Sequence, residues 1–500
     1  MTLKESVKDS PTRLEFYPFA YALFTDELDT YCWYCLQECP QKKHCIGCGM
    51  AIFCNKECQK LGWKDHKAEC KGFRTATKLA DIEVRLLGRI VLRYKTITSG
   101  KDKEEADFYK DRTSQRQIME IWAHVDKMRD DEFAKKKFNE IYTELTGFYE
   151  EKFLLPRDLV FELHCRNYIN RHAISDKGYM KEIGKGLYLD LCAYDHSCRP
   201  NTIYTCDGFK ATLRALNSSV NLLDKKNTFY SYIEILCSQQ QRRKLLKDTW
   251  YFTCECERCM DSNDHRLTSI LCPTCSKVEP TEILIWGEGA NKNPTTQIIT
   301  CKKCSETLSA QYVIEAIQAM RFIDSIFEDQ ELDQMPAKSQ MPFLQDLLQR
   351  FGEILPHVNV YYCRLIQALI PMIPPGDNHE LLRLHLMSEE CVRQSFPHNH
   401  PAVAFHLRNI GIFAGNLQKK EKSLKYFEEA QQILNFTLDP DHPMSKENQR
   451  LWDQAKTIVI EKKLEEITLN DPKETAATTK KAEPVDEDDE DAGDMPELIN

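Results

Sequence analysis

Apolar residues recur at near-helical spacing in three long stretches of the chain. The first, about residues 78–152, contains two such series: Ile82, Val84, Leu86, Leu87, Ile90, Val91 and Leu92, and then Ile118, Ile121, Trp122 and Val125. Pro156 separates this stretch from a second predicted helix at about 158–171. The third stretch runs from about 309 to 467. Because apolar side chains at this spacing share one helix face, the pattern predicts a chain rich in helices.

Shorter apolar runs between the helical stretches predict strands. FYPFAYALF at residues 16–24 is typical of a strand or a pair of strands, and ILIW at 283–286 is also strand-like. A further short apolar segment, residues 187–193, ends abruptly in DHSCRPN. Pro200 fixes its own φ and favours an extended Arg199, so we expect this strand-like chain to enter a compact turn.

The helical C-terminal stretch carries a faint repeat. Pro397-x2-His400-Pro401 recurs as Pro440-x-His442-Pro443, and the apolar spacing between them is that of a two-helix tetratricopeptide-type unit. Ordinary helical packing without a repeat is the alternative interpretation. Residues 471–500 hold eleven acidic and three basic residues and almost no large apolar ones, so we expect a disordered acidic tail.

Composition limits the compartment and the partners. The chain has 22 cysteines, many in closely spaced pairs, and its N-terminus lacks an apolar signal segment, so we expect metal ligands rather than disulfides. No apolar run approaches the length of a membrane span. The net charge of −10 comes mostly from the tail, which argues against generic binding to phosphate backbones. We expect a protein of the nucleus and cytoplasm.

Four pairs of potential metal ligands lie close together near the N-terminus. They are Cys32 and Cys35, Cys45 and Cys48, Cys54 and Cys58, and His66 and Cys70, with Cys39 left over. Eight ligands suffice for two tetrahedral zinc ions. So short a segment cannot bury a large core, so metal must supply its folding free energy.

Two further groups of cysteines follow. Cys198 of the compact turn and the three cysteines of CECERC, Cys254, Cys256 and Cys259, suit a third tetrahedral zinc that would fasten the turn to the later segment. Cys272, Cys275, Cys301 and Cys304 form two C-x2-C pairs and predict a zinc ribbon, with a degenerate insert as the alternative.

These motifs carry a resemblance to known families. The order of the ligand pairs and Trp63-x2-His66 resemble a MYND zinc finger, which implies that Cys32, Cys35, Cys54 and Cys58 share one zinc and Cys45, Cys48, His66 and Cys70 the other. GKGLY, DHSCRPN and CECERC resemble the SET domain of protein-lysine methyltransferases and its post-SET zinc site. Over about residues 10–465 the chain is similar to the SET-and-MYND (SMYD) family.

The resemblance implies an α+β multidomain protein, in which a MYND finger splits a SET-like β core, a post-SET zinc site follows, and the C-terminal domain is all-α and tetratricopeptide-like. The implied boundaries are a SET remnant (1–31), the finger (32–70), a helical insert (71–165), the SET core (166–253), the post-SET site and ribbon (254–308), the helical domain (309–470) and the tail (471–500).

It also implies methyl transfer from S-adenosyl-L-methionine to a lysine amine. Tyr232 matches the catalytic tyrosine, and the residues matching cofactor-binding positions are Asn170, Asp195, His196 and Phe252. His172 and Trp250 would line the substrate channel. The amine must lose its proton and lie in line with the sulfonium methyl, which is mainly a matter of positioning.

Several positions depart from the family pattern. The first glycine is Gly47, so we expect the family's Gly-x-Gly cofactor strand to be missing, and Asp195 stands where asparagine is usual. Lys225-Lys226-Asn227 replaces a Gly-Glu-Glu segment. Trp250 stands where a second channel tyrosine is expected, and His172 where relatives often carry phenylalanine. The zinc ligands show no such departures.

Three functions therefore remain open. The first is a protein-lysine methyltransferase acting on a histone or another protein. The second is a catalytically weak or inactive scaffold, whose finger holds a proline-containing peptide and whose helical C-terminus holds a second partner. The third is nucleic-acid binding through the finger, because residues 40–74 carry eight basic and three acidic residues, although solvated lysines are the commoner explanation.

Overall fold

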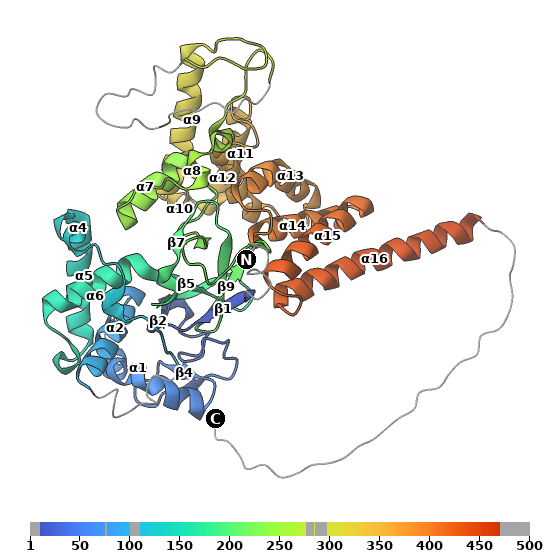
Figure 1. The fold of residues 1–500 in the computed structure, drawn as a ribbon. Coiled ribbons are helices and arrows are strands. Elements are labelled where there is room, and N and C mark those ends of the chain that lie inside the picture. Colours follow the sequence, from blue (N-terminus) through green and yellow to red (C-terminus); the bar gives the residue numbers. More distant parts are fainter. Residues whose placement is uncertain (1–10, 76–77, 101–110, 277–284, 286–297, 471–500) are drawn as a thin grey trace, which may run out of the picture. The chain divides into compact units, whose positions relative to one another are not determined.

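The computed structural model describes residues 11–75, 78–100, 111–276, 285 and 298–470 (Figure 1). Its strands are β1 (Arg13–Phe16), β2 (Ala20–Leu23), β3 (Lys43–His44), β4 (Ile52–Phe53), β5 (Arg171–Ser175), β6 (Glu182–Leu187), β7 (Asp195–His196), β8 (Thr202–Asp207), β9 (Lys210–Ala215) and β10 (Phe229–Tyr230). The helices before residue 300 are α1 (Lys56–Thr75), α2 (Ile82–Thr98), α4 (Val125–Asp130), α5 (Glu132–Phe148), α6 (Arg157–Asn170), α7 (Gln239–Trp250) and α8 (Glu257–Met260).

The helices of the C-terminal part follow one another closely. They are α9 (Ala310–Glu328), α10 (Glu331–Gln334), α11 (Ala337–Phe351), α12 (Val360–Leu369), α13 (Asn378–Ser395), α14 (Pro401–Asn416), α15 (Lys420–Thr437) and α16 (Pro443–Asn470). Short 3-10 turns include Ile118–Glu120 and Ser262–Thr268. The predicted acidic tail and most of the predicted strand at 283–286 lie outside the described residues.

The two N-terminal strands join sheets whose other strands come much later in the chain. β1 is antiparallel to β9, which also pairs with β8, and β2 is antiparallel to β6, which also pairs with β5. Figure 1 shows this meeting of blue and green strands. In the second sheet Gly184 faces Leu23, and a Cβ on Gly184 would lie 2.3 Å from the carbonyl oxygen of Ala22. Only glycine allows the two backbones to come this close.

Buried ion pairs attach the cysteine-rich segment to these strands. Helix α1 ends this segment, and Glu69 of α1 accepts two hydrogen bonds from Arg89 of α2, of 2.7 and 2.8 Å. The Arg89 guanidinium also donates to the carbonyl of Tyr21 in β2. Because both charges are buried and fully paired, removing either one would leave an uncompensated charge in the core.

The helix predicted from Ile118, Ile121, Trp122 and Val125 is wrong for most of that segment. Ile118–Glu120 is a single 3-10 turn, Ile121 is extended, and the Trp122 side chain is 74% exposed. Side chains rather than a helix satisfy this backbone: Arg166 Nε donates to the carbonyl of Ile118, and Asn170 Nδ2 donates to that of Trp122. Tertiary hydrogen bonds therefore override the local apolar pattern.

The turn after residue 194 is threaded by a later segment. β7 runs parallel to β10, with Asp195 facing Phe229 and His196 facing Tyr230. The Asn201 side chain closes the arrangement, since its Oδ1 accepts from the Phe229 amide at 2.8 Å and its Nδ2 donates to the Asn227 carbonyl at 2.7 Å. As a result, Tyr232 is placed beside His196.

The two His-Pro pairs occupy equivalent places at the starts of α14 and α16. His400 Nδ1 accepts from the amide of Ala402, and His442 Nδ1 accepts from the amide of Met444, both at 3.2 Å. Each histidine thus satisfies an amide that the first helical turn leaves free. Between them, α14 and α15 pack closely, because a Cβ on Gly411 would lie 3.2 Å from the Phe427 ring.

Candidate functional site

The cysteine-rich N-terminal segment brings its eight candidate ligands into two groups. Cys32, Cys35, Cys54 and Cys58 form one, and Cys45, Cys48, His66 and Cys70 form the other, with the ligand atoms of each group within 4.8 Å of one another. Burial lowers the pKa of His66 to about 4, so its imidazole is neutral at physiological pH. A neutral histidine and clustered thiols are the donor set that zinc requires.

Both C-x2-C pairs of this segment share one backbone geometry. The residue after the second cysteine, Leu36 or Gly49, has a positive φ of 57° or 72°. Its amide donates back to the carbonyl of the first cysteine, Cys32 at 3.0 Å and Cys45 at 2.8 Å. This tight turn directs the two sulfurs of each pair to the same side, and it puts Leu36 in a conformation that glycine adopts more easily.

A third group joins Cys198 of the threaded turn to Cys254, Cys256 and Cys259. The Sγ atoms of Cys198 and Cys259 are 3.6 Å apart, and the amide of Cys198 donates to Cys256 Sγ at 3.3 Å. Hydrogen bonds to Cys254 and Cys256 raise the pKa of Cys198, whereas hydrogen bonds from Cys198 and Cys254 lower the pKa of Cys256. Four thiolates could not share this buried volume unless a cation balanced them, which fits a zinc ion.

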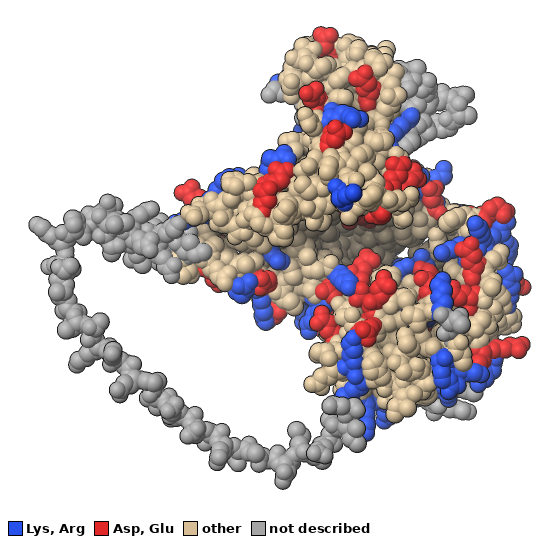
Figure 2. Space-filling view, turned by 180° about the vertical axis from the view of Figure 1, so that it is seen from behind, with Lys and Arg blue, Asp and Glu red and all other residues tan. Residues whose placement is uncertain are grey.

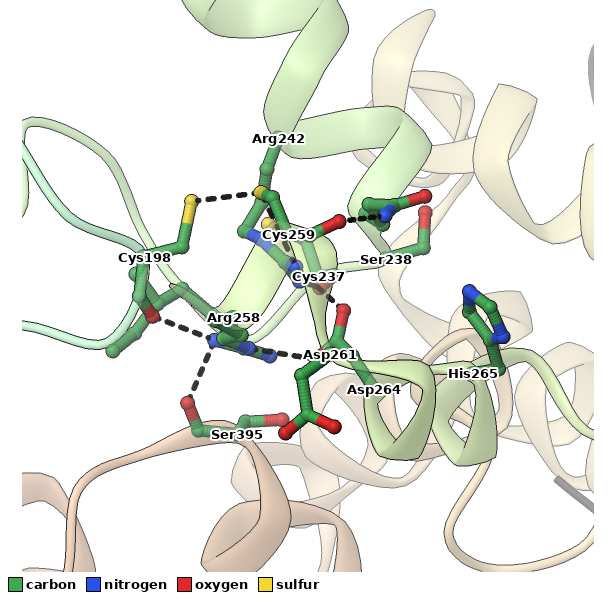
Figure 3. A network of polar contacts seen from close by, with 12 residues as sticks. Cys198, Cys237, Ser238, Arg242, Arg258, Cys259, Asp261, Asp264, His265 and Ser395 are labelled. Atoms are coloured by element: carbon green, nitrogen blue, oxygen red, sulfur yellow. Dashed lines mark hydrogen bonds and ion pairs between the residues drawn. The ribbon is translucent and has the colours of Figure 1, made fainter. Parts of the chain in front are cut away.

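Two buried arginines lie against this third group (Figure 3). Asp264 pairs with both, since it accepts from Arg258 Nε at 2.7 Å and from Arg242 Nη2 at 2.5 Å. Arg242 Nη2 also lies 3.9 Å from Cys259 Sγ. Two guanidinium groups against one carboxylate leave one excess positive charge, which complements the charge of −2 on a zinc bound to four thiolates.

A fourth group contains Cys272, Cys275, Cys301 and Cys304. Cys272 Sγ is 3.6 Å from Cys304 Sγ, and Cys275 Sγ is 3.7 Å from Cys301 Sγ. Hydrogen bonds from backbone amides and neighbouring thiols overcome the effect of burial and lower the pKa of Cys272 to about 7. Most of the chain between the two pairs lies outside the described residues, but the four ligand atoms themselves are placed.

A cavity of about 430 Å³ lies beside the threaded turn. Tyr232 lines it, and the Tyr232 hydroxyl donates to the carbonyl of Tyr194 at 2.9 Å while the Tyr232 amide donates to His196 Nδ1 at 3.0 Å. The rings of Tyr230 and Trp250 lie 5.1 and 5.6 Å from the Tyr232 ring. Burial raises the pKa of Tyr232, so its phenol stays protonated.

Three predicted site residues line the same cavity. Asn170 directs its amide nitrogen to the carbonyls of Trp122 and Arg166, both at 2.8 Å. His172 shares a hydrogen bond of 2.7 Å with the Tyr230 hydroxyl, and burial lowers the pKa of His172 to about 4. Trp250 donates from its indole to the carbonyl of Ile169 at 2.7 Å.

The other predicted cofactor positions lie behind Tyr232 and outside this cavity. The His196 ring is 5.3 Å from that of Tyr232 and 6.3 Å from that of Phe252. Phe252 is partly exposed, and Asp195 is exposed. The structure thus brings all the predicted residues into one neighbourhood, on two sides of Tyr232.

Sequence reasoning missed most of the residues that line the cavity, and four of them bear on its chemistry. Glu182 and Glu234 add carboxylates, while Phe396 and His400 come from the segment between α13 and α14, with their rings 4.8 Å apart. Glu234 lies two residues after Tyr232, so proximity could have suggested it. Nothing in the sequence indicates that the C-terminal helices supply part of this wall.

The side of the molecule drawn in Figure 2 carries charges of both signs. Figure 2 shows lysines and arginines interspersed with aspartates and glutamates over the visible side of the molecule. In the part of the chain that the structure describes, we find no helix with the length and apolar character needed to cross a membrane.

The mixed α and β fold, with clusters of cysteine ligands around it, defines a zinc-binding protein. The MYND finger family matches residues 32–70. Human histone-lysine N-methyltransferase SMYD3 is 24% identical over 85% of this chain and 88% of its own length. The Caenorhabditis elegans SET domain-containing protein 14 is 26% identical over 72% of this chain and 78% of its own. Human N-lysine methyltransferase SMYD2 is 29% identical over 48% of this chain and 53% of its own.

The finger match and these relatives support a member of the SMYD family and indicate a family of SET-domain lysine methyltransferases. The predicted resemblance is therefore confirmed at the level of the family, and the finger match and cysteine clusters support zinc binding.

Proposed function

We propose that this protein is an S-adenosyl-L-methionine-dependent protein-lysine N-methyltransferase that acts on a histone or another protein. The observation that carries the proposal is the Tyr232 hydroxyl, which is fixed by the Tyr194 carbonyl in an aromatic cavity between Asn170 and Glu234. A tyrosine held in this way can orient an amine that enters the cavity.

Asn170 in the cavity lining and three residues outside the cavity, Asp195, His196 and Phe252, fit the cofactor. When bound, S-adenosyl-L-methionine supplies an electrophilic sulfonium methyl group. Asn170 uses its amide nitrogen for backbone carbonyls, so its Oδ1 remains an acceptor for the ammonium of the cofactor. His196 and the partly exposed Phe252 ring would hold the rest of the cofactor, and Asp195 offers a further acceptor.

The cavity fits a lysine side chain. Glu182 and Glu234 offset the charges of Arg171 and Lys181 in the lining, and the rings of Tyr230, Tyr232 and Trp250 offer a surface for its ammonium and methylene groups. Loss of water favours the neutral amine over the ammonium. Because the Tyr232 phenol donates to Tyr194, the lone pairs of its oxygen remain to accept from the amine and to align it with the methyl group.

We also propose the domain boundaries that the resemblance to the SMYD family implies. Strand pairing across the finger supports a SET core that combines residues 1–31 with residues 166–253 and is interrupted by the finger (32–70) and a helical insert (71–165). The post-SET site and ribbon take residues 254–308. The equivalent His-Pro helix starts support a tetratricopeptide-like domain over 309–470, followed by the tail (471–500).

We propose four zinc ions, two in the finger, one in the post-SET group and one in the fourth group. The fourth group repeats the backbone geometry of the finger pairs. Ser276 and Ser305 have φ values of 51° and 60°, and their amides donate to the carbonyls of Cys272 and Cys301, both at 2.8 Å. The left-handed region is sterically unfavourable for serine. Metal binding by the two cysteines of each pair would offset the cost of this conformation.

A catalytically weak scaffold is the second candidate, and Asp195 favours it. The Asp195 charge contributes to the raised pKa of Tyr232, after the larger effect of burial, so this carboxylate acts on the catalytic position. A second negative charge there would repel the carboxylate of the cofactor. In this case the finger would bind a proline-containing peptide, and Ile46 and Trp63 expose apolar surface on it. Either function suits a nuclear and cytoplasmic protein.

The deciding experiment is calorimetric titration of the full chain with S-adenosyl-L-methionine, followed by transfer of labelled methyl groups to histones and to a lysate. We expect saturable one-to-one binding and label on lysine. Absence of binding at millimolar cofactor would refute the enzyme and leave the scaffold. Binding without transfer to any protein would place the defect in the substrate cavity.

A further inference from the structure

Arg258 lies next to the post-SET cysteine group, with Cys198, Asp264 and Ser395 around it (Figure 3). It is only 1% exposed, and its charge is paired with Asp264. Arg258 adds to the positive charge beside the cysteine group, but it donates no hydrogen bond to a ligand sulfur among those described. Its contacts instead run to backbone carbonyls.

One nitrogen of Arg258 joins three separate segments. Nη1 donates to the carbonyl of Cys198 at 3.2 Å, of Ile235 at 3.0 Å and of Ser395 at 2.8 Å. Cys198 belongs to the threaded turn, Ile235 lies three residues after Tyr232, and Ser395 is the last residue of α13. A buried carbonyl that loses its donor costs free energy, so these three contacts hold the segments together.

Two of the three segments contribute residues to the cavity wall. Ile233, Glu234 and Ile235 line it from the loop after Tyr232. Phe396, directly after Ser395, lines it from the C-terminal helices. Asn170 lines the cavity too, but its polar contacts are to Trp122 and Arg166.

We propose that Arg258 is a positioning residue that sets the width of the substrate cavity by holding the loop after Tyr232 against the end of α13. This inference rests on the proposed methyltransferase function. Two of its three backbone contacts, to Ile235 and Ser395, adjoin the wall of the substrate cavity, so we expect its larger effect on the peptide side of the site.

The test compares Arg258→Lys with Arg243→Lys in the full chain. Lysine keeps the buried charge beside Asp264 but cannot reach it and three carbonyls at once. Arg243 lies next to Arg242 on α7 and donates to the carbonyls of Cys254 and Cys259, so it touches the same cysteine loop without touching the cavity wall.

We expect Arg258→Lys to keep the zinc content of the wild type and to raise the KM for a lysine peptide about tenfold, while the KM for the cofactor changes less than about twofold. Amide hydrogen exchange in residues 232–237 and 392–397 should quicken about tenfold. Arg243→Lys should change none of these.

Equal effects of the two substitutions, or a joint change in zinc content and both KM values, would overturn the proposal and assign Arg258 a purely structural role. Should Arg258→Lys fail to fold, Phe396→Ala must raise the peptide KM alone, and an unchanged peptide KM would also overturn it. Should the wild type transfer no methyl groups, the proposed function fails, and the exchange comparison still decides whether Arg258 couples the segments.

Discussion

The zinc finger and the substrate cavity are assembled in opposite ways. All eight finger ligands come from residues 32–70, whereas the cavity draws its lining from residues 169 to 400. Metal can fold the finger locally because its bonds replace a hydrophobic core. The cavity depends on distant segments held by buried hydrogen bonds, such as those of Arg258. Damage to the finger should therefore act on folding, and damage to the cavity on activity.

The largest effect should follow the loss of a finger ligand. We expect Cys45→Ser to release one to two zinc equivalents and to lower the melting temperature by roughly 10 °C, because metal bonds supply much of the free energy that folds this short segment. Metal analysis and calorimetry measure both. Cys39→Ser is the matched control, since Cys39 is buried in the same segment but lies outside both ligand groups. Equal effects of the two substitutions would contradict a finger held by metal.

Tyr232→Phe should reduce activity and leave the fold and the zinc sites intact. We expect kcat to fall about 100-fold, with zinc content and melting temperature nearly unchanged, because only the oxygen that aligns the amine is lost. Tyr362→Phe is the control, since this hydroxyl also donates to a backbone carbonyl, that of Leu348, far along the chain in the C-terminal helices. Retention of full methyl transfer by Tyr232→Phe would remove Tyr232 from the mechanism.

The pH dependence of methyl transfer should report the titration of the substrate lysine rather than that of Tyr232 or His172. Burial raises the pKa of Tyr232 and lowers that of His172 to about 4, so neither group changes charge between pH 6 and 9. We then expect the substrate amine, with an ordinary pKa near 10.4, to set the pH dependence, and kcat/KM should rise up to about tenfold per pH unit. An inflection near pH 6.5 would show that His172 is less buried in solution. His172→Phe is the control that should leave the slope unchanged.

Substitutions in the fourth cysteine group test whether the chain holds a zinc ion there, outside the finger and the post-SET group. Cys275→Ser should lower the zinc content from four equivalents to three, with the finger and post-SET sites still loaded. Cys237→Ser, outside every group, should leave it at four. Three equivalents in both the wild type and Cys275→Ser would show that the fourth group binds no zinc.

Asp195→Asn should give the smallest effect and act only on the cofactor side. Removing one negative charge near the carboxylate of the cofactor should tighten its binding about threefold to tenfold, while the KM for the peptide stays constant. Calorimetry measures the first and steady-state kinetics the second. Weaker cofactor binding would show that the carboxylate is an acceptor that the cofactor needs.

Much of the fold could be predicted from local patterns. The helices over residues 309–467 and the strands within residues 16–24 follow from apolar spacing, and the structure has them. The segment at 118–125 was predicted as helix because Ile118, Ile121 and Trp122 have the right spacing. Arg166 and Asn170 instead satisfy its carbonyls from outside. No local pattern reports such a distant donor.

The sequence by itself determined which side chains can hold zinc, since thiols at fixed short spacing can reach one ion whatever the rest of the chain does. It also indicated the resemblance to the SMYD family, through GKGLY and DHSCRPN. Only the tertiary structure decided that Phe396 and His400 close the cavity and that Arg258 joins its walls to the cysteine turn. The physical reason is the separation of the residues along the chain. The two cysteines of a C-x2-C pair are near neighbours in the sequence, so their spacing is visible there. The cavity forms only after segments up to about two hundred residues apart have packed and their buried carbonyls have found hydrogen-bond donors.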